Sequence, residues 1–220
     1  MILGDGPFPH LAPTPFMLAN IVVQFFLKGG PVMGPILLCA LASVAVAGER
    51  AFWWWRERRT RDPQTLTQLL AALDRDDVRA ATNLAAASRD PVVRMIHSGL
   101  SHRPPSLAGA LQLAAGLELK RAGRSLILMD TLVTLAPLLG LLGTVVGLMK
   151  AFINVGSAEL SVEPVTGGIG EALIATACGL GVAIFSLIAC SFFTSKVADL
   201  QFELETAATH VEMKLSDGSA

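Results

Sequence analysis

Two threonines, Thr144 and Thr176, are the residues of this 220-residue sequence best placed for chemistry in an apolar setting. Thr144 borders a row of glycines, and Thr176 lies on a helix face made of small side chains. If the two faces meet, both hydroxyls lie in one narrow, nearly charge-free channel, where they can hold a chain of water molecules. Two simpler interpretations remain open: each hydroxyl can donate to its own backbone one turn earlier, and small-residue faces are commonly packing surfaces only.

The glycine row and the small face predict close packing of two helices. Gly140, Gly143 and Gly147 fall within about 60° of one another on a helical wheel, and the last two form a GxxxG pair. The small face recurs at helical spacing and consists of Ala172, Thr176, Gly179, Ala183, Ser186 and Cys190. Another face of that segment suits lipid or a neighbouring subunit, and it carries Leu173, Leu180, Ile184 and Leu187. Pro137 predicts a kink, because it removes a backbone hydrogen bond within its helix.

The middle of each apolar segment contains no Asp, Glu, Lys, Arg or His. A proton relay through hydrocarbon needs such a group, so a proton-carrying acid would have to come from another chain. Glu171, at the start of an apolar segment, is the nearest candidate for a role in the pathway. It is equally compatible with a carboxylate that stabilises the first turn of its helix.

Motifs for other chemistry are missing. His97 and His102 are five residues apart and therefore lie on different helix faces, and no cysteine or acid completes a zinc set. We find no nucleophile and base pattern, P-loop or dinucleotide fingerprint, so we expect no enzyme activity, metal or cofactor. The net charge of −1 gives no indication of nucleic-acid binding. Three cysteines lie in apolar runs, where we expect free thiols.

The composition places these residues in a membrane protein. The chain is 52% hydrophobic and 16% charged, which is too apolar for an ordinary soluble domain. Residues 29–48, 131–149 and 172–195 carry no charge. Each segment is long enough for a helix to cross about 30 Å of hydrocarbon. We predict an all-α, polytopic membrane protein with three transmembrane helices and long helices extending into the cytoplasm.

The distribution of basic residues predicts the topology. Of the 17 Lys and Arg residues, 13 lie between Arg50 and Arg124, which puts that region in the cytoplasm by the positive-inside rule. Asp5 and four prolines make the N-terminus unlike a signal peptide, so we expect it to be retained. The predicted segments are a periplasmic N-terminus with an interfacial amphipathic helix at 1–28, transmembrane helix 1 at 29–55, a cytoplasmic helical domain at 56–124, transmembrane helix 2 at 125–153, a periplasmic loop at 154–167, transmembrane helix 3 at 168–195 and a cytoplasmic C-terminal helix at 196–220.

An aromatic and basic cluster follows the first span. Trp53, Trp54, Trp55 and Arg56 form it, and indoles in the headgroup zone with an arginine reaching water are typical of an interface anchor. A stacking platform for a ligand is the competing interpretation. We expect the anchor.

The cytoplasmic region predicts further helices. Pro63, Pro91 and Ser106 are expected to open helices, and nothing firmly stops the last of these before about Phe152. After Lys196 the apolar positions keep helical spacing, which predicts a tail packed against neighbouring helices. These positions are Val197, Leu200, Leu204, Ala207, Val211 and Leu215.

The sequence resembles a known family, the MotA/TolQ/ExbB proton channel family, and within it the ExbB/TolQ branch. The resemblance is strongest in APLLGLLGTVVGLMKAF at 136–152 and GIGEALIATACGLGVAI at 168–184. It is supported by the GG-x3-G-P-I-L-L…E-R pattern at 29–50. One departure is that many relatives have a proline after residues 183–184, where this chain has Phe185 and Ser186.

The resemblance implies a homopentamer in the bacterial inner membrane, with a periplasmic N-terminus and a cytoplasmic C-terminus. Its second and third helices would line a pore holding an ExbD/TolR-like single-span partner that carries the membrane aspartate. Proton flow would then deliver work to the outer membrane through a TonB- or TolA-like protein, for TonB-dependent uptake or Tol-type envelope maintenance. Thr144 and Thr176 match the family's pore threonines, Glu171 matches its glutamate, and Pro137 matches its proline.

Two other functions stay open. A non-conducting membrane scaffold would stabilise a single-span partner, and its two threonines would face a dry interface instead of a polar pore. A MotA-like flagellar stator subunit is disfavoured, because that branch usually has a fourth span and a larger cytoplasmic domain.

Overall fold

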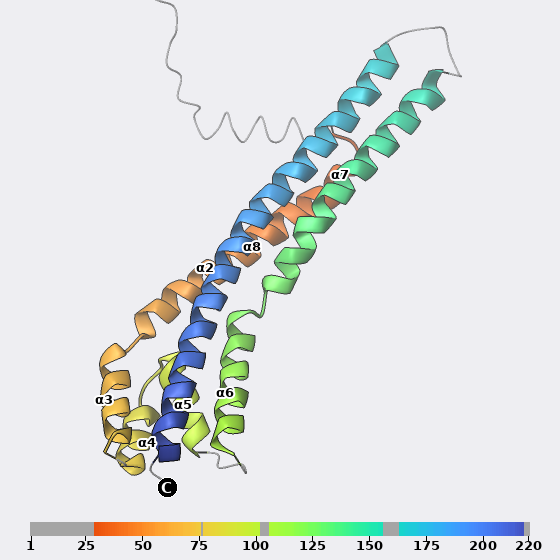
Figure 1. Cartoon of the computed structure of the whole chain (residues 1–220). Coiled ribbons are helices and arrows are strands. Elements are labelled where there is room, and N and C mark those ends of the chain that lie inside the picture. Colours follow the sequence, from red (N-terminus) through yellow and green to blue (C-terminus); the bar gives the residue numbers. More distant parts are fainter. Residues whose placement is uncertain (1–28, 76, 102–105, 156–162, 218–220) are drawn as a thin grey trace, which may run out of the picture. The chain divides into compact units, whose positions relative to one another are not determined.

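The computed structural model describes residues 29–75, 77–101, 106–155 and 163–217 (Figure 1). In these residues the fold is all-α, as predicted, with seven helices and no strand. The helices are α2 (Met33–Thr60), α3 (Pro63–Leu73), α4 (Val78–Ala86), α5 (Pro91–Ser101), α6 (Leu107–Ala122), α7 (Leu126–Val155) and α8 (Glu163–Asp217). The interfacial helix predicted within residues 1–28 lies outside the described residues.

Three of these helices are long and apolar enough to cross a membrane. The candidate spans are Met33–Thr60, Leu126–Ile153 and Thr166–Leu215, which belong to α2, α7 and α8. Hydrocarbon about 30 Å thick needs roughly 20 residues of helix, and each span exceeds that length. The predicted three-span architecture is therefore confirmed.

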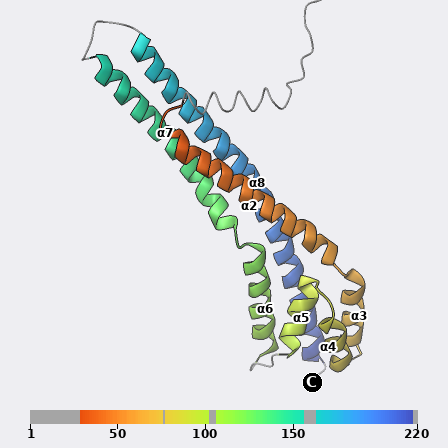
Figure 2. The same cartoon turned by 180° about the vertical axis from the view of Figure 1, so that it is seen from behind.

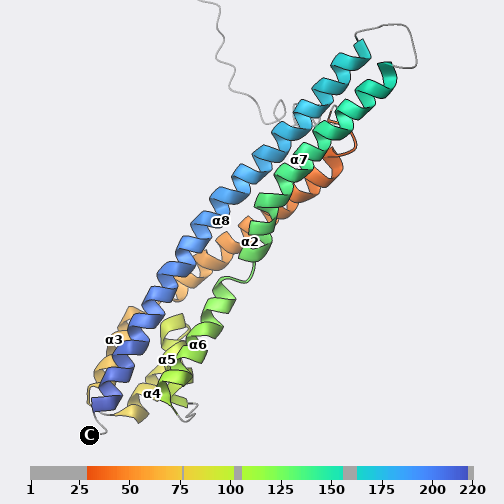
Figure 3. The ribbon, with the colours of Figure 1, turned by 45° about the vertical axis from the view of Figure 1, so that its right-hand side comes forward.

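The chain forms two compact units. The first unit comprises residues 1–41 and 134–183, and the second comprises residues 42–133 and 184–220. In the first unit α7 and α8 run side by side (Figure 3), and a small core forms where the start of α2 meets α8. The buried members of this core are Val32, Met33, Ile36 and Ala175.

The second unit has the larger core. The helices α3, α4, α5 and α6 gather around the C-terminal end of α8 (Figures 1 and 2). The fully buried side chains include Leu69, Met95, Ile96, Leu111 and Leu204. On α8, Leu200, Leu204, Ala207 and Val211 are buried, and Val197 and Leu215 pack against the same core. The predicted packing of the C-terminal tail is confirmed.

Local sequence signals begin the helices of the second unit. Helix α3 begins at Pro63 and α5 at Pro91, as predicted. Ser106 caps α6, and its hydroxyl accepts a hydrogen bond from the Gly109 amide at 3.2 Å. Asp62 caps α3 by accepting from the Thr65 hydroxyl and amide, and these bonds hold the pKa of the Asp62 carboxyl below its usual value.

The expected single helix from Ser106 to Phe152 is wrong, because the chain breaks between α6 and α7 at residues 123–125. At the break the Gly123 amide donates to the Leu119 carbonyl at 2.8 Å and closes α6. The Arg50 guanidinium, only 2% exposed, donates to the carbonyls of Ala122 at 3.1 Å and Arg121 at 3.4 Å. The last carbonyls of a helix need such donors, and a distant arginine supplies them here.

Replacing Leu204 with alanine should destabilise the second unit by about 2 to 5 kcal/mol, the usual cost of opening a cavity at a fully buried leucine. Denaturant unfolding of the purified protein in detergent measures this change. The matched control is Phe202→Ala on the same helix, because Phe202 is 72% exposed and should change stability by about 0.5 kcal/mol at most. Equal losses in both variants would contradict the described packing of α8.

Candidate functional site

The glycine row of α7 lies directly against α8 in the first unit. A Cβ atom added at Gly140 would lie 3.1 Å from the Thr176 Cα atom. At Gly143 it would lie 2.5 Å from the Ala175 Cβ atom. These distances leave no room for side chains, so the absence of Cβ atoms lets the two helices approach closely.

The small face of α8 makes the same contact from the other side. A Cβ atom at Gly179 would lie 2.6 Å from the carbonyl oxygen of Ala136, and one at Gly168 would lie 2.8 Å from the Ala151 Cβ atom. The contact therefore runs from Ala136 to Ala151 along α7, a length of about 22 Å at 1.5 Å per residue. Helix α7 continues through Pro137, which lies next to Ala136.

Both threonine hydroxyls donate to backbone carbonyls. The Thr176 hydroxyl reaches across from α8 to the Gly140 carbonyl on α7, at 2.8 Å. The Thr144 hydroxyl donates to the Leu141 carbonyl of its own helix at 2.6 Å. Gly140 lies one helical turn before Thr144, so the two hydroxyls lie at neighbouring turns of α7. The Thr176 hydroxyl thus makes a hydrogen bond between the two helices. The Thr144 hydroxyl makes a bond to its own backbone about one turn earlier, which was one of the simpler interpretations of the sequence.

Glu171 forms an ion pair that the sequence analysis missed. Its Oε1 atom lies 2.8 Å from the Nζ atom of Lys150 on α7. The carboxylate also lies over Gly30, whose φ of +71° is in the left-handed region, and a Cβ atom there would be 1.7 Å from Glu171 Oε1. Glycine alone leaves this space open. The start of α8, the end of α7 and the residues before α2 therefore meet at Glu171.

Large apolar side chains point away from the contact between α7 and α8. On α8 the predicted outer positions Leu173, Leu180, Ile184 and Leu187 are 63%, 48%, 58% and 51% exposed. On α7 the exposed residues include Leu138, Leu141, Val145, Met149 and Phe152. Apolar surface of this extent needs lipid or other protein to cover it.

Comparison with known proteins now fixes the family. The sequence model of the MotA/TolQ/ExbB proton channel family matches residues 87–206. This chain belongs to that family. The resemblance found in the two blocks at 136–152 and 168–184 is thereby confirmed, and the MotA/TolQ/ExbB family is a proton-channel family and not an enzyme family.

Individual relatives support the ExbB/TolQ branch of the MotA/TolQ/ExbB family. A Synechocystis protein named biopolymer transport protein ExbB-like 1 is 38% identical over 190 residues, which cover 82% of this chain and 74% of the relative. A second Synechocystis protein, ExbB-like 3, is 34% identical over 175 residues, which cover 77% of this chain and 83% of the relative. The biopolymer transport protein ExbB of Neisseria gonorrhoeae is 43% identical over 81 residues, 36% of this chain and 37% of the relative.

The tryptophan cluster of this MotA/TolQ/ExbB family member has two environments. Trp54 is 8% exposed and belongs to the core of the second unit, whereas Trp55 is 53% exposed. The Arg59 guanidinium stacks on the Trp55 ring at 4.1 Å, and Arg56 is exposed. The exposed members suit the predicted interface anchor, while Trp54 is an additional packing residue.

Metal ligands do not cluster in the described part of this channel-family chain. No group of three or more His, Cys, Asp and Glu side chains that could hold a metal ion occurs there, and His102 lies outside it. The three cysteines Cys39, Cys178 and Cys190 are free thiols.

Replacing Gly179 with alanine should destabilise the protein by about 1 to 3 kcal/mol, because the new methyl group meets the Ala136 carbonyl. The thermal midpoint of the detergent-solubilised protein measures the loss. Gly181→Ala is the matched control, since a Cβ atom there has no neighbour within 4 Å in the described residues. A midpoint that falls as far for the control as for Gly179→Ala would contradict the helix contact.

Proposed function

We propose that this chain is the ExbB/TolQ-like subunit of a proton-channel motor complex, which couples the proton motive force across the inner membrane to work at the outer membrane. The observation that carries the proposal is the Thr176 hydroxyl, held at the tight contact of α7 and α8 by the Gly140 carbonyl. Around it the apolar segments 131–149 and 172–195 contain no charged residue. The work that the proton flow drives is TonB-dependent uptake or Tol-type envelope maintenance, and a TonB- or TolA-like protein transmits it.

The hydroxyls suit a water chain even though both already donate hydrogen bonds. A hydroxyl has one donor and two acceptor lone pairs. The Thr176 oxygen can therefore accept from a water molecule while its hydrogen stays bonded to Gly140, and the Thr144 oxygen can do the same. Both threonines keep partly exposed positions in the single chain, which supports their contact with a pore.

The acid that carries the proton belongs to a second protein in this proposal. Movement of protons through hydrocarbon requires a titratable group, and the middle of each span lacks one. An ExbD/TolR-like single-span partner with a membrane aspartate supplies it. In this proposal Glu171 and Lys150 form the periplasmic rim of the pathway, and the basic residues between Arg50 and Arg124 lie at the cytoplasmic side of the membrane.

Several copies of the chain surround the partner, and we propose a pentamer. The exposed leucines and valines of α7 and α8 are too extensive for a water-exposed surface, and copies of α7 and α8 arranged around an axis would cover part of them. The remaining apolar surface faces lipid.

The proposed topology follows the charge distribution. The N-terminus and the 154–167 loop lie in the periplasm, and the 56–124 and 196–220 segments lie in the cytoplasm of a bacterial cell. The boundaries of the spans at 29–55, 125–153 and 168–195 are those predicted from the sequence. The basic residues between Arg50 and Arg124 support this orientation.

Replacing Thr176 with valine should abolish proton flux, because it keeps the shape of the side chain and removes the hydroxyl. The flux is measured with a pH-sensitive dye in membrane vesicles from cells that express the variant with its native partners. The lost bond to Gly140 should cost about 0.6 to 2 kcal/mol of stability, which leaves the complex assembled. The yield of the purified complex checks this.

Thr176→Ser restores a hydroxyl and is the matched control, so it should recover most of the flux. Normal flux in Thr176→Val would overturn the pore role of this residue. Absence of flux from the wild-type complex under the same conditions would favour the non-conducting scaffold.

A further inference from the structure

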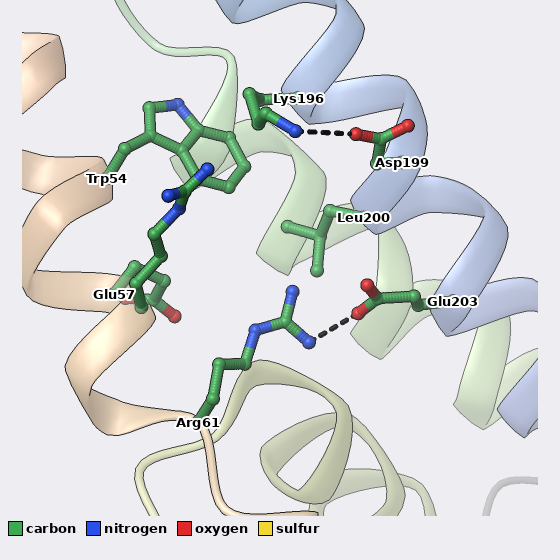
Figure 4. A pocket seen from close by; sticks show the side chains of 8 residues that line it. Trp54, Glu57, Arg61, Lys196, Asp199, Leu200 and Glu203 are labelled. Carbon is green, nitrogen blue, oxygen red and sulfur yellow. Dashed lines mark hydrogen bonds and ion pairs between the residues drawn. The ribbon is translucent and has the colours of Figure 1, made fainter.

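A pocket of about 280 Å³ lies between α2 and α8 in the second unit (Figure 4), and the proposed channel function does not use it. Small-ligand sites begin at about 300 Å³, so its size suits a small group. The lining residues are Trp54, Glu57, Arg58, Arg61, Lys196, Asp199, Leu200 and Glu203. Six of these eight side chains are ionisable, which suits a polar and charged ligand.

The charges of the pocket balance, but they are unevenly distributed. Arg58 lies in α2 and Arg61 directly follows that helix, whereas Asp199 and Glu203 come from α8 on the opposite wall (Figure 4). The α2 side also carries Glu57, and the α8 side also carries Lys196. The lining therefore holds three cations and three carboxylates. A neutral site with this separation of charge complements a zwitterion better than a simple anion.

Several of these charges retain capacity for a ligand. Lys196 pairs with Asp199 at 3.0 Å, and Arg61 pairs with Glu203. The side chains of Asp199 and Glu203 nevertheless remain 59% and 46% exposed, and a carboxylate accepts several hydrogen bonds. Arg58 is exposed and forms no ion pair within the described residues.

Two buried atoms of the lining residues lack hydrogen-bond partners in the described part of the chain. They are the indole Nε1 of Trp54 and the Oε1 atom of Glu57, and both residues are only 8% exposed. Buried polar groups are nearly always hydrogen-bonded. Both atoms are closed to solvent, and the Glu57 Oε1 atom lies 3.6 Å from the Nη2 atom of Arg94 in an ion pair, so the contacts of a ligand must come from the exposed charges of the lining.

The pocket lies where the apolar part of α8 ends. Residues 172–195 carry no charge, and Lys196 follows directly. Ile188 and Phe192 precede it on the face that carries Asp199 and Glu203, within about 60° on a helical wheel. They are 65% and 55% exposed. An acyl chain can lie along this apolar stretch while its headgroup occupies the pocket.

We propose that this pocket binds the headgroup of a membrane phospholipid that carries a phosphate and a primary ammonium, as in phosphatidylethanolamine. The phosphate accepts hydrogen bonds from the Arg58 guanidinium. The ammonium donates to the carboxylates of Asp199 and Glu203. A choline headgroup has the same charges without N–H donors, and a glycerol headgroup lacks the cation, so the site distinguishes the three.

Native mass spectrometry of the full-length protein tests the proposal, after exchange into nanodiscs that contain equal amounts of phosphatidylethanolamine, phosphatidylcholine and phosphatidylglycerol. The wild-type protein should retain the ethanolamine lipid about five to ten times more than either other lipid, as expected for a few charge-assisted hydrogen bonds. Asp199→Asn and Arg58→Gln should each bring the ratio close to one. Both residues are exposed, so thermal midpoints should confirm that the variants fold.

Two control variants remove a charge outside the pocket. Glu205→Gln on α8 and Arg79→Gln on α4 change exposed residues that do not line it, and they should keep the wild-type ratio of ethanolamine to choline lipid. Equal retention of all three lipids by the wild-type protein would overturn the proposal. So would a preference for phosphatidylglycerol that Arg58→Gln abolishes and Asp199→Asn does not, because that pattern describes an anion site.

Discussion

The close approach of α7 and α8 is the contact on which the membrane part of this protein depends. Lipid is as apolar as leucine, so helices in a bilayer associate through close van der Waals packing and not through the hydrophobic effect. Gly140, Gly143 and Gly179 provide that packing by lacking side chains at the contact. Because the backbones lie so near, the short side chain of Thr176 reaches a carbonyl on the other helix.

The same contact determines where the large side chains go. With small residues on the facing sides, the leucines, valines and phenylalanines of both helices point outward. A single chain therefore exposes apolar surface that only lipid or further protein can cover. The geometry of one helix pair thus decides which side chains of α7 and α8 face outward.

Much of the architecture could be predicted because its signals are local or periodic. Uncharged runs identify the three spans, Pro63 and Ser106 mark helix starts, and the spacing of apolar residues after Lys196 identifies the buried face of the tail. The break between α6 and α7 was missed. Gly123 was the available signal, but glycine alone does not end a helix, and the donors of Arg50 come from about 70 residues earlier in the chain.

The candidate site was predictable to a similar degree. Small-residue periodicity identified both faces of the contact, although Ala175, which fills the space at Gly143, was not among the predicted residues. The ion pair of Glu171 with Lys150 was missed, because the two residues lie 21 positions apart in different helices. Nor does helical periodicity show that Gly30 adopts a positive φ to accommodate the carboxylate.

Arg50 has a further consequence for how the protein is made. It is the first basic residue after the uncharged part of α2, and positive charges so near a span end direct the orientation of a helix during insertion. At that moment α6, whose carbonyls Arg50 later binds, has not yet been synthesised. In the topology proposed above, one side chain therefore serves first in biogenesis and then in the folded protein, and its substitution should cause errors in insertion as well as in folding.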